Sequence, residues 1–299
     1  MTDTTTDTID RLAGLAQGNP SFTTRHEREK VALATQACED LLLGSQLDSA
    51  LTQAERLVLA AEQARVSGVA ALEADYRARA EALSDAITPE LRTILEQPDA
   101  QTGNARMDAM LHFVRTLALN PAESDQAALL AIPAAGLSLN DTVLLAQLIG
   151  FVAYQARLLV GVKAMSDMGG VDYAPATEPA ATAPFVHPAN LPPPGEPLRR
   201  NGFTSETLDW KAWLEVLSPD TTTPEQQHVL EVSHPKAKTM DFYLVLARQP
   251  QVLLERSQAF NAIMYAPGGL SRAEREVAAT AVSRSNGCVY CASVHAQRF

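Results

Sequence analysis

Apolar positions recur every three or four residues from residue 8 to residue 165 and again from residue 210 to the C-terminus. That spacing is typical of α-helices, and no stretch shows the alternation of a half-buried strand. Between residues 166 and 201 the pattern gives way to a segment rich in proline and glycine. Such a segment sustains neither a helix nor a strand ladder, so it is predicted to be a stiff, extended linker. The sequence therefore predicts an all-α protein with two helical domains, at residues 1–165 and 202–299.

A repeat displaced by 219 residues relates the two predicted domains: Leu51–Ala60 aligns with Leu270–Ala279, and Gly68 aligns with Gly287. Each copy starts with a serine or threonine followed three residues later by glutamate, the pattern of a helix capping box. Each aligned glycine stands where a helix would end in the left-handed conformation. The repeat unit is therefore predicted to be a helix, a tight turn and a second helix.

Some charged residues of the repeat occur in both copies, and others occur in only one. Each copy has a Glu-Arg pair at the same position, Glu55-Arg56 in the first and Glu274-Arg275 in the second. Because the pair occurs in both copies, a structural cap and ion pair is favoured over catalysis. Glu276 has no acidic counterpart in the first copy, where Leu57 takes its place. It is therefore the better candidate for a chemical role.

The charge balance limits the possible partners. The chain has 24 Lys and Arg against 35 Asp and Glu, a net charge of −11, which argues against nucleic acid and anionic membranes as partners.

The first ten residues lack the features of a signal peptide. The longest apolar stretch, Val143–Val162, is interrupted by polar residues and is predicted to be a buried helix, with no membrane span. We expect a cytoplasmic protein, because three cysteines also fit a reducing compartment.

Two cysteines and a histidine near the C-terminus form the segment with the most chemistry. Cys288 follows an Asn-Gly break and is predicted in the first turn of a new helix, where the helix dipole favours a thiolate. Cys291 and His295 follow on the same helical face, and Glu276 on the preceding helix could reach them. A thiolate that attacks a peroxide becomes a sulfenic acid and then condenses with a second thiol to a disulfide. Glu276 and His295 would relay the proton in such a reaction.

Other interpretations of these cysteines are weaker. A structural zinc site needs a fourth ligand, and none stands at a matching spacing. Haem attachment needs the histidine directly after the second cysteine, and a thioredoxin-type site needs a βαβ unit. Buried, inert cysteines stay open as an interpretation. Cys38 has no partner at metal or disulfide spacing and is predicted to be a small core residue. Redox chemistry by the thiols themselves is favoured, and it calls for no cofactor or metal.

Glu276, Cys288, Cys291 and His295, preceded by Leu270–Arg275, resemble the signature of the alkylhydroperoxidase D-like, carboxymuconolactone decarboxylase superfamily. The resemblance implies an all-α fold and a thiol-dependent peroxidase that acts as an antioxidant. It implies that Cys291 attacks a hydroperoxide, that Cys288 resolves the intermediate, and that Glu276 and His295 form the proton relay. It also implies assembly into homotrimers or hexamers and re-reduction by an external thiol or dithiol partner.

The two copies differ in their chemical groups and in their length. The first copy has Leu57, Val69, Leu72 and Tyr76 at the four signature positions, so we expect it to be degenerate and catalytically silent. The second copy has no counterpart of the later helices of the first, so it is expected to be truncated. Two alternatives to a peroxidase stay open: a lactone decarboxylase-like lyase, which needs no cysteine pair, and a non-catalytic protein whose repeats build an oligomer.

Overall fold

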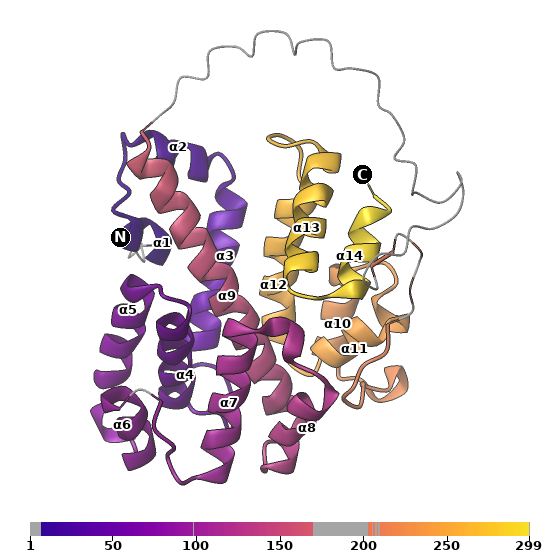
Figure 1. The fold of residues 1–299 in the computed structure, drawn as a ribbon. Coiled ribbons are helices and arrows are strands. Elements are labelled where there is room, and N and C mark those ends of the chain that lie inside the picture. The colour runs from indigo at the N-terminus through magenta and orange to yellow at the C-terminus, as the bar shows by residue number, and fades with distance from the viewer. Residues whose placement is uncertain are drawn as a thin grey trace, which may run out of the picture.

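The computed structural model describes residues 7–169 and 203–298, apart from residues 98, 205, 207 and 209, and its described residues form α-helices without a strand (Figure 1). The prediction of an all-α fold is therefore confirmed. The predicted proline-rich linker, residues 166–201, lies outside the described residues apart from residues 166–169. The N-terminal half contains α1 (Thr8–Ala13), α2 (Pro20–His26), α3 (Glu29–Leu43), α4 (Gln53–Val66), α5 (Ala70–Glu81), α6 (Pro89–Glu96), α7 (Ala105–Leu119), α8 (Gln126–Ala134) and α9 (Leu139–Asp167). The C-terminal half contains α10 (Pro224–Ser233), α11 (Asp241–Leu246), α12 (Pro250–Met264), α13 (Arg272–Ser285) and α14 (Val289–Ala296).

Helix α4 lies at the centre of the N-terminal half, where α5, α6, α7 and α9 pack around it. Its side chains are buried almost all the way round, as expected of a helix enclosed by others. By length and composition alone, α9 is the one helix among the described residues that could cross a membrane, and 61% of its most apolar window is buried. Burial of that kind is typical of a core helix, as the interrupted apolar run predicts.

The repeated unit is visible in the local structure of both halves. Helices α4 and α13 begin at aligned residues, and both start with a capping box, Thr52 with Glu55 and Ser271 with Glu274. Both end next to a glycine with positive φ, +72° at Gly68 and +73° at Gly287. The predicted caps and left-handed turns are therefore confirmed.

The shared arginines have a different role from the predicted ion pair. Arg56 donates from Nε to the carbonyl of Leu42 and from Nη2 to that of Gly44, both at 2.6 Å. Arg275 donates in the same way to the carbonyl of Ala266, at 2.7 Å. Because these carbonyls lie at the end of the preceding helix or in the loop that follows it, the arginines hold the start of each repeat helix against that segment. The predicted structural role of the motif is confirmed, but in the described residues neither arginine pairs with the glutamate before it, and Glu55 forms its ion pair with Arg106 of α7 instead.

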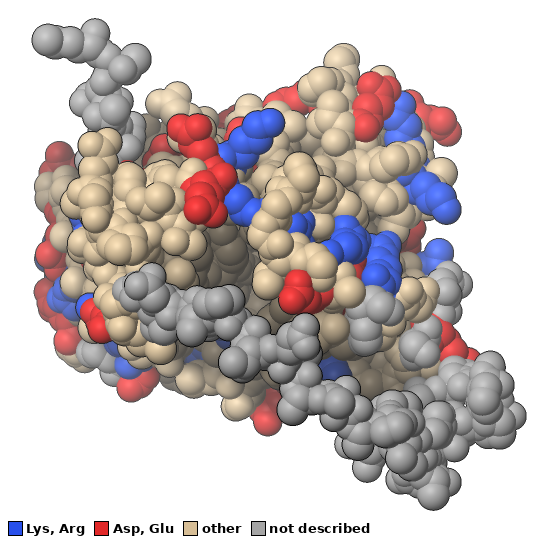
Figure 2. Space-filling model, turned by 90° about the horizontal axis from the view of Figure 1, so that it is seen from above, with Lys and Arg blue, Asp and Glu red and all other residues tan. Residues whose placement is uncertain are grey.

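The two halves meet where α3 and α12 lie side by side and antiparallel. Arg28, just before α3, donates to the carbonyl of Ala262 near the end of α12, at 3.1 Å. At the other end of the junction, Gln249 Nε2 donates to the carbonyl of Asn140, at 2.9 Å. Seen from above, the surface is hollowed between the N-terminal and C-terminal halves (Figure 2). Helix α12, which precedes the helices that carry the predicted cysteine site, is thus fixed to the N-terminal half.

Candidate functional site

The cysteine pair lies at the start of α14, directly after the turn at Gly287. Cys288 is the N-cap residue of this helix, one position earlier than the predicted first turn, and its sulfur accepts the amide N–H of Cys291 at 3.2 Å. The two residues form a disulfide with a Cα–Cα distance of 5.4 Å, within the usual range for such bonds. Both are partly exposed. An N-terminal helix turn and a donated N–H both stabilise a thiolate at Cys288 when the pair is reduced.

Glu276 and His295 contact each other across the two helices, α13 and α14, that flank the turn before the cysteine pair. Glu276 is fully buried on α13, and its Oε2 is 2.5 Å from Nδ1 of His295. The His295 side chain is 16% exposed and lies on α14, one turn after Cys291. A carboxylate bonded to Nδ1 orients the imidazole and leaves Nε2 available for proton exchange. Of the four residues that the sequence singles out, the structure pairs Cys288 with Cys291 and Glu276 with His295, and it places His295 one turn after Cys291 on α14.

Arg272 completes this cluster, and the sequence analysis did not identify it. Its guanidinium forms an ion pair with Oε1 of Glu276, four residues later on α13. It also donates to the carbonyl of Met264 at 3.0 Å and stacks over the ring of Tyr265, 4.4 Å from its centroid. Arg272 thus contacts one carboxylate oxygen of Glu276, and His295 contacts the other.

A comparison of the two copies contains the signal that could have identified Arg272. The first copy has Gln53 at the equivalent position, and there the leucine Leu57 replaces the glutamate. Like Arg272, Gln53 donates a hydrogen bond to a backbone carbonyl before its helix, that of Leu43 at 2.9 Å, but it has no carboxylate to pair with at the position of Leu57. The positive charge is therefore present only where the buried carboxylate is present, which indicates that the two act together.

Contacts from the N-terminal half and from the segment before α10 position the turn that carries the cysteines. A Cβ on Gly287 would lie 2.8 Å from Cβ of Ala122, in the short helix η2 (Pro121–Glu123). The ring centroid of Trp210 lies 5.7 Å from that of Phe242 on α11 and 6.4 Å from that of Tyr290 on α14. Trp210 therefore packs onto the C-terminal helices, whereas Trp213 is half exposed.

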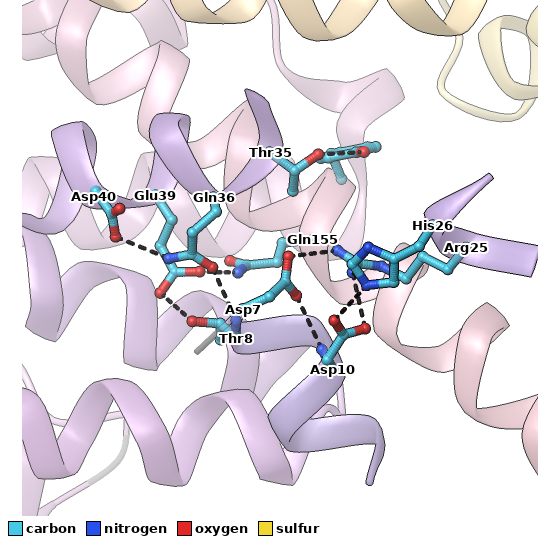
Figure 3. Close-up of polar contacts among 11 residues, drawn as sticks. Asp7, Thr8, Asp10, Arg25, His26, Thr35, Gln36, Glu39, Asp40 and Gln155 are labelled. Carbon is cyan, nitrogen blue, oxygen red and sulfur yellow. Dashed lines mark hydrogen bonds and ion pairs between the residues drawn. The ribbon is translucent and has the colours of Figure 1, made fainter. Parts of the chain in front are cut away.

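The equivalent region of the first copy contains no comparable cluster. Leu57 and Leu72 are buried in the apolar core. Tyr76, which aligns with His295, donates its hydroxyl to Gln155. Gln155 in turn donates to Glu39, in the polar network beside α1 that Figure 3 shows. These side chains are buried, bonded to one another and part of the N-terminal core, which is a structural arrangement.

Chemically, the cluster in the second copy joins two thiols, a buried carboxylate, an imidazole and a guanidinium. This set can carry out acid–base chemistry and can cycle between dithiol and disulfide. Among the described residues, no group of three or more His, Cys, Asp or Glu side chains is arranged to hold a metal ion. The zinc interpretation of the two cysteines and the histidine therefore gains no support from the geometry.

Comparisons with known proteins give one result that bears on this region. Residues 250–299 match the model of the carboxymuconolactone decarboxylase family. The match covers α12, α13 and α14 and includes all five residues of the cluster, so the predicted superfamily is confirmed for this segment. Neither a curated protein nor a solved structure gives a significant match to the chain.

Proposed function

With the carboxymuconolactone decarboxylase family match of residues 250–299 as the premise, we propose that this segment is a thiol-dependent peroxidase. One observation carries the proposal: a disulfide-forming cysteine pair starts the same helix whose His295 contacts the buried Glu276. A lyase that uses only acid and base groups has no need of two cysteines at disulfide distance. An assembly protein has no need of a buried carboxylate between a histidine and an arginine.

The reaction begins with the reduced pair. The Cys291 thiolate attacks one oxygen of a hydroperoxide, so that an S–O bond forms and the O–O bond breaks. The leaving alkoxide takes a proton through His295, which Glu276 orients, and departs as an alcohol. Cys291 is now a sulfenic acid. The Cys288 thiolate attacks its sulfur, and hydroxide leaves, takes a proton and becomes water. The peroxide has been reduced by two electrons, and the cysteine pair has been oxidised to the disulfide.

An external thiol or dithiol then returns the protein to its reduced form. A reductant thiolate attacks the disulfide and releases Cys288, whose thiolate is stabilised by the N–H of Cys291 and by the helix N-terminus. Both cysteines are partly exposed, which gives the reductant access. A cytoplasmic setting would supply such thiols, and the homotrimer or hexamer implied by the sequence resemblance belongs to this proposal as well.

Turnover of cumene hydroperoxide with dithiothreitol as reductant tests the proposal. We expect the parent protein to consume the peroxide faster than dithiothreitol alone, and Cys291→Ser to fall to that background. Cys38→Ala is the matched control, because Cys38 is buried in the other half and takes no part in the reaction. A parent rate equal to the background, or full activity in Cys291→Ser, would contradict the proposal and favour a lyase or an assembly protein.

A further inference from the structure

A cavity of about 440 Å³ lies at the junction of the two halves, between α3, α9, α11 and α12. Its volume is in the range of small-molecule binding sites. Its walls are mostly aliphatic and aromatic, with Leu42, Phe151, Phe242, Leu246, Phe260 and Ile263 among the residues that line it. None of the five residues of the cysteine cluster lines this cavity.

Arg256 of α12 brings a positive charge to this apolar cavity. Its guanidinium lies between two aromatic rings, 5.3 Å from the centroid of Phe242 and 5.8 Å from that of Phe260. Among the described residues, no carboxylate pairs with it. The titratable groups that influence it are Tyr243 and Cys38, and burial raises the pKa of both, that of Cys38 to about 12. Both are therefore neutral at physiological pH. Arg256 is therefore a partly buried cation at the wall of a mostly apolar cavity, and no anion among the described residues pairs with it.

Gln147 of α9 adds a second polar group with unused hydrogen-bonding capacity. It lines the same cavity, and both polar atoms of its amide are buried without a hydrogen-bond partner. Two hydroxyl groups also line the cavity, and they already bond to each other. Oγ1 of Thr35 lies 3.0 Å from the hydroxyl oxygen of Tyr154. Buried amides are nearly always bonded in folded proteins, so an unbonded one at a cavity wall indicates a place for a ligand.

We infer that this cavity binds a monocarboxylate with an apolar body, such as a medium-chain or aromatic acid. The carboxylate accepts hydrogen bonds from the planar guanidinium of Arg256 and from the amide of Gln147, while the body of the ligand contacts the apolar walls. A phosphate would bring up to two negative charges against one cation. A neutral ligand would leave Arg256 unpaired. This binding activity goes beyond the proposed peroxidase, because the cavity and the cysteine cluster share no residue.

Calorimetric titration of the purified full chain with decanoate tests the inference, with decanol as the uncharged probe of the same length. We expect saturable binding of decanoate that is about tenfold to a hundredfold tighter than that of decanol, as one charge-assisted pair provides. Arg256→Met should abolish this difference and leave decanol binding unchanged. Arg157→Met is the matched control, since Arg157 is exposed on α9 and bonds only to its own helix.

A second variant blocks the cavity without removing a charge. Gly150 of α9 lines the cavity, and a Cβ there would meet no atom within 4 Å, so leucine at this position would occupy the cavity without a backbone clash. Because leucine favours a helix over glycine, Gly150→Leu should melt at the parent temperature or above it. We expect it to lose decanoate binding, whereas Gly161→Leu, on the same helix and away from the cavity, should retain it. The inference is overturned by a parent that does not bind decanoate, by equal affinities for decanoate and decanol, or by full binding in Gly150→Leu.

Discussion

Replacing Glu276 by glutamine removes the negative charge that contacts both Arg272 and His295 while keeping the size of the side chain. The carboxylate is fully buried, and its Oε2 lies 2.5 Å from Nδ1 of His295. If the imidazole depends on this carboxylate for its orientation, the proton relay is lost in the variant. Loss of a positioned acid–base group slows reactions by ~10²–10⁴-fold. We therefore expect Glu276→Gln to lower the rate of disulfide formation with hydroperoxide by at least ~10²-fold.

Glu276→Gln is also expected to lower the free energy of unfolding. Because Arg272, one of the two contact partners, is partly exposed to water, this loss is smaller than for a fully buried pair. A hydrogen bond to a charged group contributes ~1.5–3 kcal/mol, and Glu276 makes two such contacts. The Arg272 side chain is 37% exposed, so it regains water when the carboxylate is removed. We expect a loss of about 2–3 kcal/mol in the free energy of unfolding, measured by urea denaturation.

The assay follows the reduced protein by acid quenching and mass spectrometry at successive times after the addition of peroxide. Glu274→Gln is the matched control on the same helix. Glu274 accepts the N–H of Ser271 in the capping box, and glutamine can accept it equally. The control should keep the parent rate within about twofold, a limit well below the ~10²-fold loss expected for the relay. A folded Glu276→Gln that oxidises at the parent rate would refute the relay.

Two further substitutions test the turn that carries the cysteines and the polar network of the N-terminal half. Gly287→Ala should destabilise the protein by about 2 kcal/mol or more in urea denaturation, because φ is +73° and the new Cβ would lie 2.8 Å from Ala122. Gly161→Ala should show no loss. Burial raises the pKa of Glu39, so its contribution to stability is present below the unfolded pKa and is lost as pH rises through the folded pKa. The stability of the parent relative to Glu39→Gln should therefore fall as the pH rises above 4.5, and a constant or rising difference would contradict this.

The local features of the fold could be predicted because their causes are local. Thr52 with Glu55, and Ser271 with Glu274, form capping boxes within three residues of sequence, and Gly68 supplies a conformation that other residues adopt only with strain. The juxtaposition of Glu276 with His295 followed from the same logic, since a short turn brings two successive helices together.

The remaining features depend on contacts between residues that are distant in sequence. Arg56 resembled an ion-pair partner of its neighbour, but the fold places around it the backbone carbonyls of Leu42, near the end of α3, and of Gly44, just after it. Gln147 and Arg256 are separated by more than a hundred residues, and each looks like an ordinary polar position of a helix. Only the packing of α9 and α12 around one cavity gives these two residues a shared role.

The most direct test of the central claim is a single-turnover count of thiols and products with one equivalent of cumene hydroperoxide. We expect the reduced protein to lose two of its three thiols as a Cys288–Cys291 disulfide and to release one cumyl alcohol. Cys38 should stay reduced, because burial raises the pKa of its thiol to about 12. Three remaining thiols and unchanged peroxide would contradict a peroxidase function for this cysteine pair.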